Sequence, residues 1–180
     1  MDNPGSPMDV SKKYEFENVN SKMAMDITDG KMEENVNVQQ HPANHLTCQQ
    51  WTLKDFGGNY YYIHSVADNN FVLRPTTGTN GGNICIIPYS NKDSAMLFKF
   101  SKNPDGSYMI LSRASRNAFC IEVVNGSTAK AANVQIFGPI NHPCQHWNVL
   151  VATEVSLSMQ PVKTKIYKEK DLVHTVVFVK

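Results

Sequence analysis

The sequence predicts an all-β protein built from three copies of one unit, and three observations predict it. A motif occurs twice almost unchanged: Cys48-Gln49-Gln50-Trp51-Thr52-Leu53 returns as Cys144-Gln145-His146-Trp147-Asn148-Val149. A degenerate copy, Met96-Leu97-Phe98-Lys99-Phe100, lies between them, so that the three aromatic positions are 47 and 49 residues apart. Short period-2 alternation of apolar and polar residues runs through residues 14–149, with no convincing amphipathic helix. A fixed period of this size indicates a repeat architecture.

The first unit reads as four short strands separated by turns. Tyr14 and Phe16 alternate with glutamates, which is the pattern of a half-buried strand. Asp29-Gly30 is a strong turn signal, and Pro42 ends the third strand. The predicted strands are 14–19, 23–27, 37–41 and 49–53, and the Gly-rich segment 55–59 is predicted to close the unit as a turn.

Units two and three repeat this order. Their predicted strands are 60–64, 71–74, 83–87 and 97–100, then 108–111, 119–123, 133–137 and 145–149, with turns at 68–70, 78–82, 103–106, 115–117, 125–126 and 138–139. Because one unit is too small to bury its own apolar face, the three units must share one core. Closing twelve strands with threefold pseudosymmetry removes exposed strand edges. We therefore predict a β-trefoil rather than a three-bladed propeller, because propellers have four to eight blades.

Internal alignment of the units exposes one polar position in each. Asp26, Arg74 and Glu122 are spaced by 48 residues, and each stands four residues before a glycine, which is Gly30, Gly78 or Gly126. Asn37-Val38-Gln39 matches Asn133-Val134-Gln135, with Asn83-Ile84-Cys85 as the altered copy. Two residues after the Gln position the units carry His41, Ile87 and Phe137.

These residues resemble the ricin B-type (R-type) β-trefoil lectins and the related carbohydrate-binding modules of glycoside hydrolases. The family repeats an apolar-Asp-apolar triplet, a Gly, then Asn-Val-Gln-apolar-aromatic, and finally Gln-x-Trp. Residues 14–149 carry this pattern three times, most completely in units one and three. The resemblance implies a lectin, a non-enzymatic protein that binds galactose-type or related neutral sugars weakly.

In this family the Asp, the aromatic residue and a nearby polar residue contact the sugar. A carboxylate can accept two hydroxyl hydrogen bonds, and an aromatic ring covers the C–H face of the sugar. The resemblance implies that repeat 1 is the better site and repeat 3 a poorer copy, whereas Arg74 and Ile87 leave repeat 2 silent. The implied carbohydrate-binding residues are Asp26, Gln39, His41, Asn44 and Gln49 in repeat 1, and Glu122, Gln135, Phe137, Asn141 and Gln145 in repeat 3.

Purely structural roles compete with these assignments. Trp51, Phe98 and Trp147 are expected in the core, because large aromatic residues dominate cores. Gln49 and Gln145 are expected to bond backbone within their own unit and to support the site rather than touch sugar. Asp26, beside a turn, has the alternative role of capping local backbone N–H groups.

Composition and charge indicate which kinds of partner and location to expect. The chain has 180 residues and a formal charge of +1, so nothing indicates a nucleic-acid-binding surface. No apolar run approaches the roughly 18 residues that span a bilayer, and the N-terminus lacks the pattern of a signal peptide. We expect no cofactor and no metal, and a cytoplasmic protein or one released without a signal peptide. A secreted or toxin-associated location is the alternative.

The four cysteines depart from the family. Secreted members of the family that this chain resembles often carry one disulfide within a unit. No unit of this chain has cysteines at both of the matching positions. Cys48 and Cys144 instead sit at matching places, just before the Gln of the Gln-x-Trp motif in units one and three. This departure fits a reducing compartment.

Three segments follow from the repeats: a flexible leader at 1–13, a trefoil at 14–150 with repeats at about 14–57, 58–106 and 107–150, and a β-strand extension at 151–180. Within the extension, 153–159, 163–168 and 172–179 read as strands, with a hairpin turn at 169–171. Residues 152–180 are expected to pack on the trefoil, form a homodimer, or begin a further domain such as that of a toxin.

Other function classes fit less well. No nucleophile motif such as Gly-x-Ser-x-Gly is present, and Asp26 and Glu122 lie in different units, which argues against a glycosidase pair. A trefoil protease inhibitor is the first alternative, but such inhibitors lack the repeated Gln-x-Trp register. A protein-interaction or toxin-targeting module with decayed sugar sites is the second, and Arg74 and Ile87 favour it.

Overall fold

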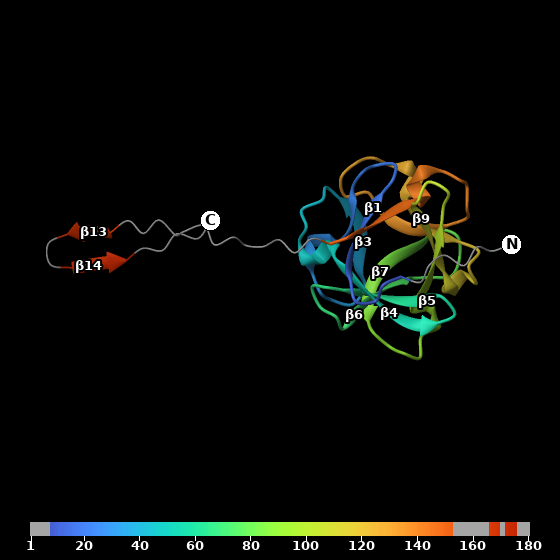
Figure 1. The fold of residues 1–180 in the computed structure, drawn as a ribbon, viewed down its shortest axis with the longest axis horizontal. Coiled ribbons are helices and arrows are strands. Elements are labelled where there is room, and N and C mark those ends of the chain that lie inside the picture. The colour runs from blue at the N-terminus through green and yellow to red at the C-terminus, as the bar shows by residue number, and fades with distance from the viewer. Residues whose placement is uncertain (1–7, 153–165, 170–171, 176–180) are drawn as a thin grey trace.

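The computed structural model describes residues 8–152, 166–169 and 172–175 (Figure 1). Residues 8–152 contain twelve strands and six short 3-10 turns but no α-helix. The strands are β1 Lys13–Asn18, β2 Ala24–Ile27, β3 Val36–His41, β4 Trp51–Gly57, β5 Tyr60–Ser65, β6 Phe71–Pro75, β7 Gly82–Pro88, β8 Leu97–Lys102, β9 Tyr108–Ser112, β10 Cys120–Val123, β11 Val134–Phe137 and β12 Trp147–Val151. The 3-10 turns are η1 Thr28–Gly30, η2 Thr47–Gln49, η3 Ser94–Met96, η4 Arg113–Ser115, η5 Val124–Gly126 and η6 Pro143–Gln145.

Six strands close into a barrel. Antiparallel pairing runs from β1 to β4, β5, β8, β9 and β12 and then returns to β1. The last pairing sets Phe16 opposite Val149, so the two ends of the trefoil close the ring. A closed ring leaves no unpaired barrel edge. These six strands therefore form the closed barrel of the fold.

Three hairpins, β2–β3, β6–β7 and β10–β11, complete the fold. Their second strands meet one another: β3 pairs with β7, β7 pairs with β11, and a single bridge joins Gln39 of β3 to Asn133 beside β11. This triangle places the equivalent positions of the three repeats around one axis. The predicted β-trefoil is confirmed.

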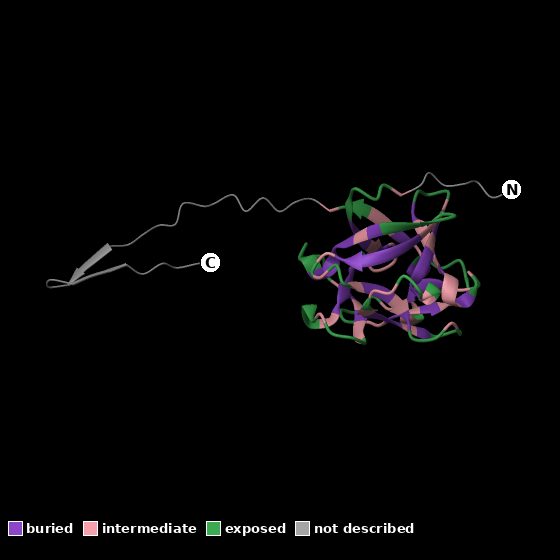
Figure 2. Cartoon of the chain, turned by 90° about the horizontal axis from the view of Figure 1, so that it is seen from below, coloured by how far each residue is buried: buried purple, intermediate pink, exposed green. Residues whose placement is uncertain are grey.

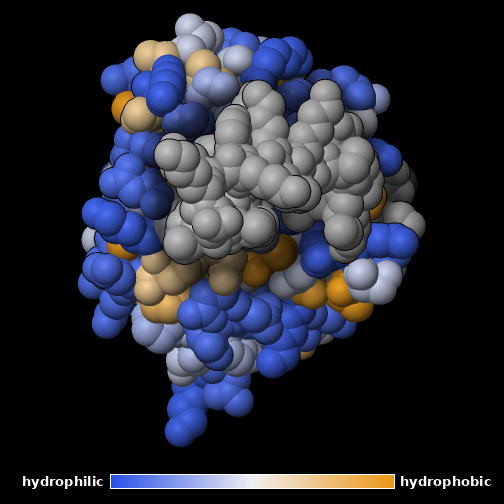
Figure 3. Space-filling model, turned by 90° about the vertical axis from the view of Figure 1, so that its left-hand side faces the viewer, coloured by the Kyte–Doolittle hydropathy of each residue, from blue (hydrophilic) through white to orange (hydrophobic). Residues whose placement is uncertain are grey.

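The core lies inside the barrel and under the hairpins (Figure 2). Trp51, Phe98 and Trp147 each have 0% exposed surface, as their equivalence predicted. Phe16 stacks on Trp51 with ring centroids 6.4 Å apart. Figure 3 shows one side of the molecule. Among the residues coloured there, hydrophilic side chains predominate and apolar ones form small groups.

Two local predictions were wrong. The Gln of each Gln-x-Trp motif does not begin a strand but ends a 3-10 turn, η2 or η6, because its backbone N–H bonds the carbonyl three residues earlier. The predicted turn at 55–59 is shorter, because β4 continues to Gly57 through an irregularity between Asp55 and Gly57. The chain then reverses at residues 58–59, where Gly58 and Asn59 both have positive φ.

The described part of the tail forms a separate hairpin. β13 (Ile166–Glu169) and β14 (Leu172–Thr175) pair antiparallel, with Glu169 opposite Leu172. Glu169, which the prediction placed in a turn, belongs to β13, and the other two residues of that predicted turn lie outside the described residues. The predicted strand at 153–159 and the rest of 163–168 and 172–179 lie outside the described residues.

The segment boundaries of the chain stay predictions. Within the expected leader, the backbone N–H of Met8 donates to the Tyr61 hydroxyl at 3.1 Å, and Met8 packs against the core. Among the helices that the structure describes, none is long and apolar enough to cross a membrane.

Candidate functional site

In repeat 1 a buried carboxylate is held by two glutamine side chains. Asp26 of β2 is 4% exposed and lies opposite Gln39 of β3. Its Oδ1 accepts from Gln39 Nε2 at 3.0 Å, and its Oδ2 accepts from Gln49 Nε2 at 3.0 Å. The first bond is local to the hairpin, whereas the second brings in η2 from farther along the repeat. The glutamine of the Gln-x-Trp motif therefore holds the carboxylate from outside the β2–β3 hairpin, through η2.

Repeat 3 builds the same arrangement with a longer acid. Glu122 of β10 is 3% exposed and lies opposite Gln135 of β11. Its Oε1 accepts from Gln135 Nε2 at 2.8 Å, and its Oε2 accepts from Gln145 Nε2 at 2.9 Å. The extra methylene of Glu122 is thus accommodated without loss of either bond.

Each Gln-x-Trp glutamine also holds the loop before it. Gln49 Oε1 accepts from the backbone of Asn44 at 2.8 Å, and its Nε2 reaches the carbonyl of Pro42 at 3.2 Å. Gln145 does the same with the backbone of Ile140 at 2.9 Å and the carbonyl of Gly138 at 2.8 Å. The prediction that these glutamines bond backbone within their own unit is confirmed. Their role in supporting a sugar site stays a prediction.

These matching bonds correct one pairing. Asn44 and Ile140 both donate their backbone N–H to the motif glutamine five residues ahead, so Ile140 is the counterpart of Asn44. Asn141, the predicted counterpart, matches His45 instead, and the two share a positive φ, 51° and 59°. The constant offset of 96 residues that relates Asp26 to Glu122 and Gln49 to Gln145, by subtraction, leads to the same pairing of Asn44 with Ile140. The choice of Asn141 departed from that offset by one residue.

The other two residues of repeat 1 that the resemblance implied to contact sugar, His41 and Asn44, lie against local backbone. His41 is half-buried, and its Nδ1 lies 3.2 Å from the carbonyl of Pro42. Asn44 is exposed, and its Oδ1 accepts from the backbone of Leu46 at 3.0 Å. Asn44 therefore caps its own loop.

A cavity of about 370 Å³ opens beside the carboxylate of repeat 3. It is lined by Glu122, Asn125, Gly126, Phe137, Ile140, His142 and Cys144. Phe137, the aromatic residue that the sequence singled out, lies on β11 and is half-buried. The cavity therefore brings together Glu122 and Phe137 but not Asn141.

Sequence reasoning missed His142 as a wall of this cavity. Its Nδ1 accepts from the backbone of Cys144 at 3.2 Å, which caps η6. Its ring lies over Gly126, where a Cβ would come within 3.1 Å of His142 Cε1. Gly126 also has φ +63°, so both its backbone and its neighbour require glycine.

The thiols beside the carboxylates stay protonated. Cys48 Sγ lies 3.7 Å from Asp26 Oδ2, and burial together with that carboxylate raises the pKa of Cys48 to about 11. Burial and the Glu122 carboxylate also raise the pKa of Cys144. All four cysteines are free and buried. Within the described residues, no group of three or more His, Cys, Asp or Glu side chains is placed to hold a metal ion.

Repeat 2 replaces the whole arrangement. Arg74 lies opposite Cys85 rather than a glutamine, and Met96 takes the place of the motif glutamine. The Arg74 Nε donates to Asp93 Oδ2 at 2.9 Å, and its Nη1 reaches the Pro75 carbonyl at 3.3 Å. No acceptor of the Asp26 kind stands at this position.

Residues 7–87 match the model of the family described as ricin-type beta-trefoil lectin domain-like. The described domain is a β-trefoil, and residues 7–87 of the chain are similar to ricin-type lectin domains. No curated protein matches the sequence.

Solved structures with this trefoil come from lectins, an enzyme and toxins. An exo-β-1,3-galactanase from Clostridium thermocellum aligns at 28% identity and a TM-score of 0.73, over 81% of this chain and 31% of its own. The Macrolepiota procera ricin B-like lectin in complex with lactose aligns at 16% identity and 0.66, over 81% and 99%. A mosquitocidal holotoxin aligns at 15% identity and 0.71, over 92% and 21%. The two distant likenesses establish the fold.

Proposed function

We propose that this trefoil is a non-enzymatic carbohydrate-binding protein that binds galactose-type or related neutral sugars through repeats 3 and 1. The observation that carries the proposal is the carboxylate held by two glutamine amides, present in both repeats. An ionised carboxylate has about four acceptor sites, of which the glutamines occupy two. Each oxygen of Glu122 therefore keeps capacity for one sugar hydroxyl, as does Asp26 Oδ1, whereas Asp26 Oδ2 also faces the Cys48 thiol at 3.7 Å.

Rigid positioning favours binding. The glutamines that orient Asp26 and Glu122 are themselves tied to backbone, so the carboxylates are fixed before a sugar arrives. A preorganised acceptor loses less conformational entropy on binding than a mobile one. Charged acceptors also make the stronger hydrogen bonds.

The geometry favours repeat 3 over repeat 1 as the principal site, which reverses the ranking expected from the sequence. In repeat 3 a cavity of about 370 Å³ contains both Glu122 and the Phe137 ring. In repeat 1 the ring position is His41, which is turned toward the Pro42 carbonyl. An aromatic ring offers the C–H face of a sugar more apolar area than an imidazole does.

Repeat 2 is proposed not to bind neutral sugars, because it has no carboxylate at the position of Asp26 and Glu122. The guanidinium of Arg74 has donors only, and Asp93 already occupies it at 2.9 Å. Two shallow sites of this kind bind weakly one at a time and gain affinity on multivalent glycans. The lactose complex of the Macrolepiota procera lectin supports the galactose-type class of sugar.

A sugar-targeting module of a larger protein is the second candidate function. The aligned galactanase and holotoxin contain this trefoil as 31% and 21% of their chains. In that case the sugar sites would direct a partner domain to a glycan surface. The chemistry of the two carboxylate sites is the same in both readings.

Titration of lactose and galactose into the full chain tests the proposal. Glu122→Gln and Asp26→Asn keep side-chain size and remove the charged acceptor, and Arg74→Ala is the control at the equivalent position of repeat 2. Loss of a charged hydrogen bond costs about 1.5–3 kcal/mol, which lowers affinity by roughly tenfold or more. We expect the larger loss in Glu122→Gln, a smaller one in Asp26→Asn and none in Arg74→Ala. Wild-type affinity in both acid variants, each shown to be folded, would refute the two sites.

A further inference from the structure

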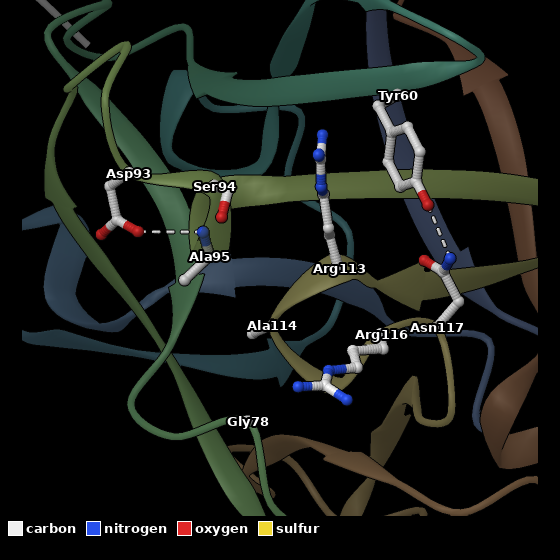
Figure 4. A pocket seen from close by; sticks show the side chains of 9 residues that line it. All are labelled: Tyr60, Gly78, Asp93, Ser94, Ala95, Arg113, Ala114, Arg116 and Asn117. Atoms are coloured by element: carbon white, nitrogen blue, oxygen red, sulfur yellow. Dashed lines mark hydrogen bonds between the residues drawn. The ribbon is translucent and has the colours of Figure 1, made fainter.

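A second cavity, of about 570 Å³, lies at the seam between repeats 2 and 3. We call it the seam cavity. Its walls come from η3 in repeat 2 and from the loop that contains η4 in repeat 3, with Tyr60 and Gly78 completing them (Figure 4). None of its lining residues belongs to the carboxylate sites of repeats 1 and 3.

Arginines give this cavity its character. The guanidinium carbon of Arg113 lies 4.9 Å from the ring centre of Tyr60 and 5.3 Å from that of Phe56. Contact with ring faces holds a guanidinium without using its N–H donors, which lie in its plane. Arg116 is exposed, at the end of the same 3-10 turn. Among the described residues neither arginine forms an ion pair.

The one carboxylate that lines the cavity is already neutralised. Asp93 Oδ2 accepts from Arg74 Nε at 2.9 Å, and Asp93 Oδ1 accepts from the backbone of Ala95 at 2.9 Å. Figure 4 shows the second of these bonds at the wall opposite Tyr60. With the Arg74–Asp93 pair balanced, Arg113 and Arg116 leave two uncompensated positive charges.

Neutral polar atoms stand beside these charges. Asn117 Nδ2 donates to the Tyr60 hydroxyl at 2.6 Å, whereas its Oδ1 is buried and has no hydrogen-bond partner. A buried acceptor without a partner is unfavourable unless something donates to it. A ligand hydroxyl is a suitable donor.

The trefoil itself does not require this basic loop. The same backbone bond closes the equivalent loops of repeats 1 and 3, Asn18 N to Met23 O at 2.8 Å and Ser112 N to Phe119 O at 3.0 Å. Four residues are enclosed in repeat 1 and six in repeat 3, by subtraction. At the first enclosed position Arg113 replaces Val19. The longer loop also adopts positive φ at both Arg116 and Asn117, 56° and 65°, a conformation that asparagine accepts readily but arginine seldom adopts.

We propose that the seam cavity binds the carboxylate or sulfate group of an acidic saccharide. Arg113 and Arg116 pair with the anion through their N–H donors, because the guanidinium fork matches the oxygens of a carboxylate or a sulfate. Asn117 Oδ1 accepts from a ring hydroxyl. The inference rests on the proposed function only in taking a sugar as the ligand, and it uses a surface separate from Glu122 and Asp26.

The experiment compares an acidic sugar with a neutral one on the full chain. Glucuronic acid and galactose 6-sulfate are titrated beside galactose, against wild type, Arg113→Gln and Arg116→Gln. Lys22→Gln is the matched control, because Lys22 carries the same charge in the equivalent loop of repeat 1 and has a positive φ of 59°. Free sulfate serves as the probe of anion binding without a sugar ring.

We expect both arginine variants to weaken the acidic sugars by roughly tenfold or more and to leave galactose unchanged. Lys22→Gln should alter neither, and added salt should weaken only the acidic sugars. Acidic sugars that bind no better than galactose, or equal losses in Lys22→Gln and Arg116→Gln, would overturn the inference. Free sulfate that binds as well as galactose 6-sulfate would overturn the saccharide part.

The two proposals fail separately. Galactose binding that depends on Glu122, with no acidic-sugar binding, overturns only the seam cavity. Acidic-sugar binding that depends on Arg113 and Arg116, with no galactose binding, overturns only the neutral-sugar sites.

Discussion

Asn83 Nδ2 donates to Asn37 Oδ1 at 2.8 Å, where the hairpins of repeats 1 and 2 meet. Asn83 Oδ1 in turn accepts from Asn133 Nδ2 of repeat 3 at 2.7 Å. The three asparagines are equivalent in the internal alignment, and all are half-buried. Asn83 therefore ties all three repeats together at the pseudo-threefold axis.

Replacing this central asparagine should destabilise the trefoil more than replacing an outer one. Asn83→Ala removes both bonds to the neighbouring asparagines, together with the bond from Asn83 Nδ2 to the Ile84 carbonyl, and leaves groups on both neighbours unpaired, which costs about 1–3 kcal/mol. Asn37→Ala removes one of the two bonds and is the comparison. Urea unfolding followed by tryptophan fluorescence measures both. Equal stabilities of the two variants would contradict the central role of Asn83.

The two buried tryptophans should respond differently to the same substitution. Trp147 Nε1 donates to the carbonyl of Ile121 at 3.0 Å, whereas the buried Trp51 Nε1 has no partner. Trp147→Phe leaves that carbonyl without its donor, but Trp51→Phe removes a polar group that was already unpaired. We expect Trp147→Phe to be the less stable by about 1–3 kcal/mol. Both lose similar volume, so a reversed order in denaturant midpoints would refute this explanation.

Gly78 should not tolerate a methyl group. A Cβ there would lie 2.3 Å from the carbonyl oxygen of Ala114, its neighbour in the lining of the seam cavity. Gly78→Ala must push the η4 loop away, at a cost of about 1–3 kcal/mol. Gly138→Ala is the control, because its Cβ would make only ordinary contacts, the nearest at 3.7 Å. Thermal unfolding compares the two, and equal melting temperatures would contradict the close approach.

Alkaline pH should weaken the fold through its buried thiols. Burial and the Asp26 carboxylate raise the pKa of Cys48 from 9.0 to about 11, and burial and Glu122 raise that of Cys120 to about 12. A raised folded-state pKa gives stability that is complete below the unfolded pKa and is lost as pH rises through the folded one.

The loss should therefore fall between pH 9.0 and about 11 for Cys48. Urea midpoints at pH 8 and at about pH 10.5 measure it, with Cys48→Ala as the comparison because lysines and tyrosines also titrate in this range. The drop in stability should be smaller in Cys48→Ala than in wild type. Parallel pH profiles would mean that this thiol does not contribute.

Local patterns of the sequence predicted the framework because the same patterns repeat. The burial of Trp51, Phe98 and Trp147 and the cross-strand position of Asp26 opposite Gln39 follow from period and register within one repeat. Alternation along a strand decides which side chains face the core, and the turn signals decide where strands end. These features needed no knowledge of how the repeats contact one another.

Tertiary contacts decided the cavities and the finer assignments. The backbone bonds to Gln49 and Gln145 show that Asn44 and Ile140 take the same structural place although their side chains differ. The seam cavity joins η3 of one repeat to the longer η4 loop of the next, and no period in the sequence links Asp93 to Arg113. The sequence alone determined the strands, turns and core positions of each repeat, through short-range periodicity and burial. Packing between repeats decided which charges are paired and which remain free for a ligand, since that depends on side chains brought together from distant parts of the chain.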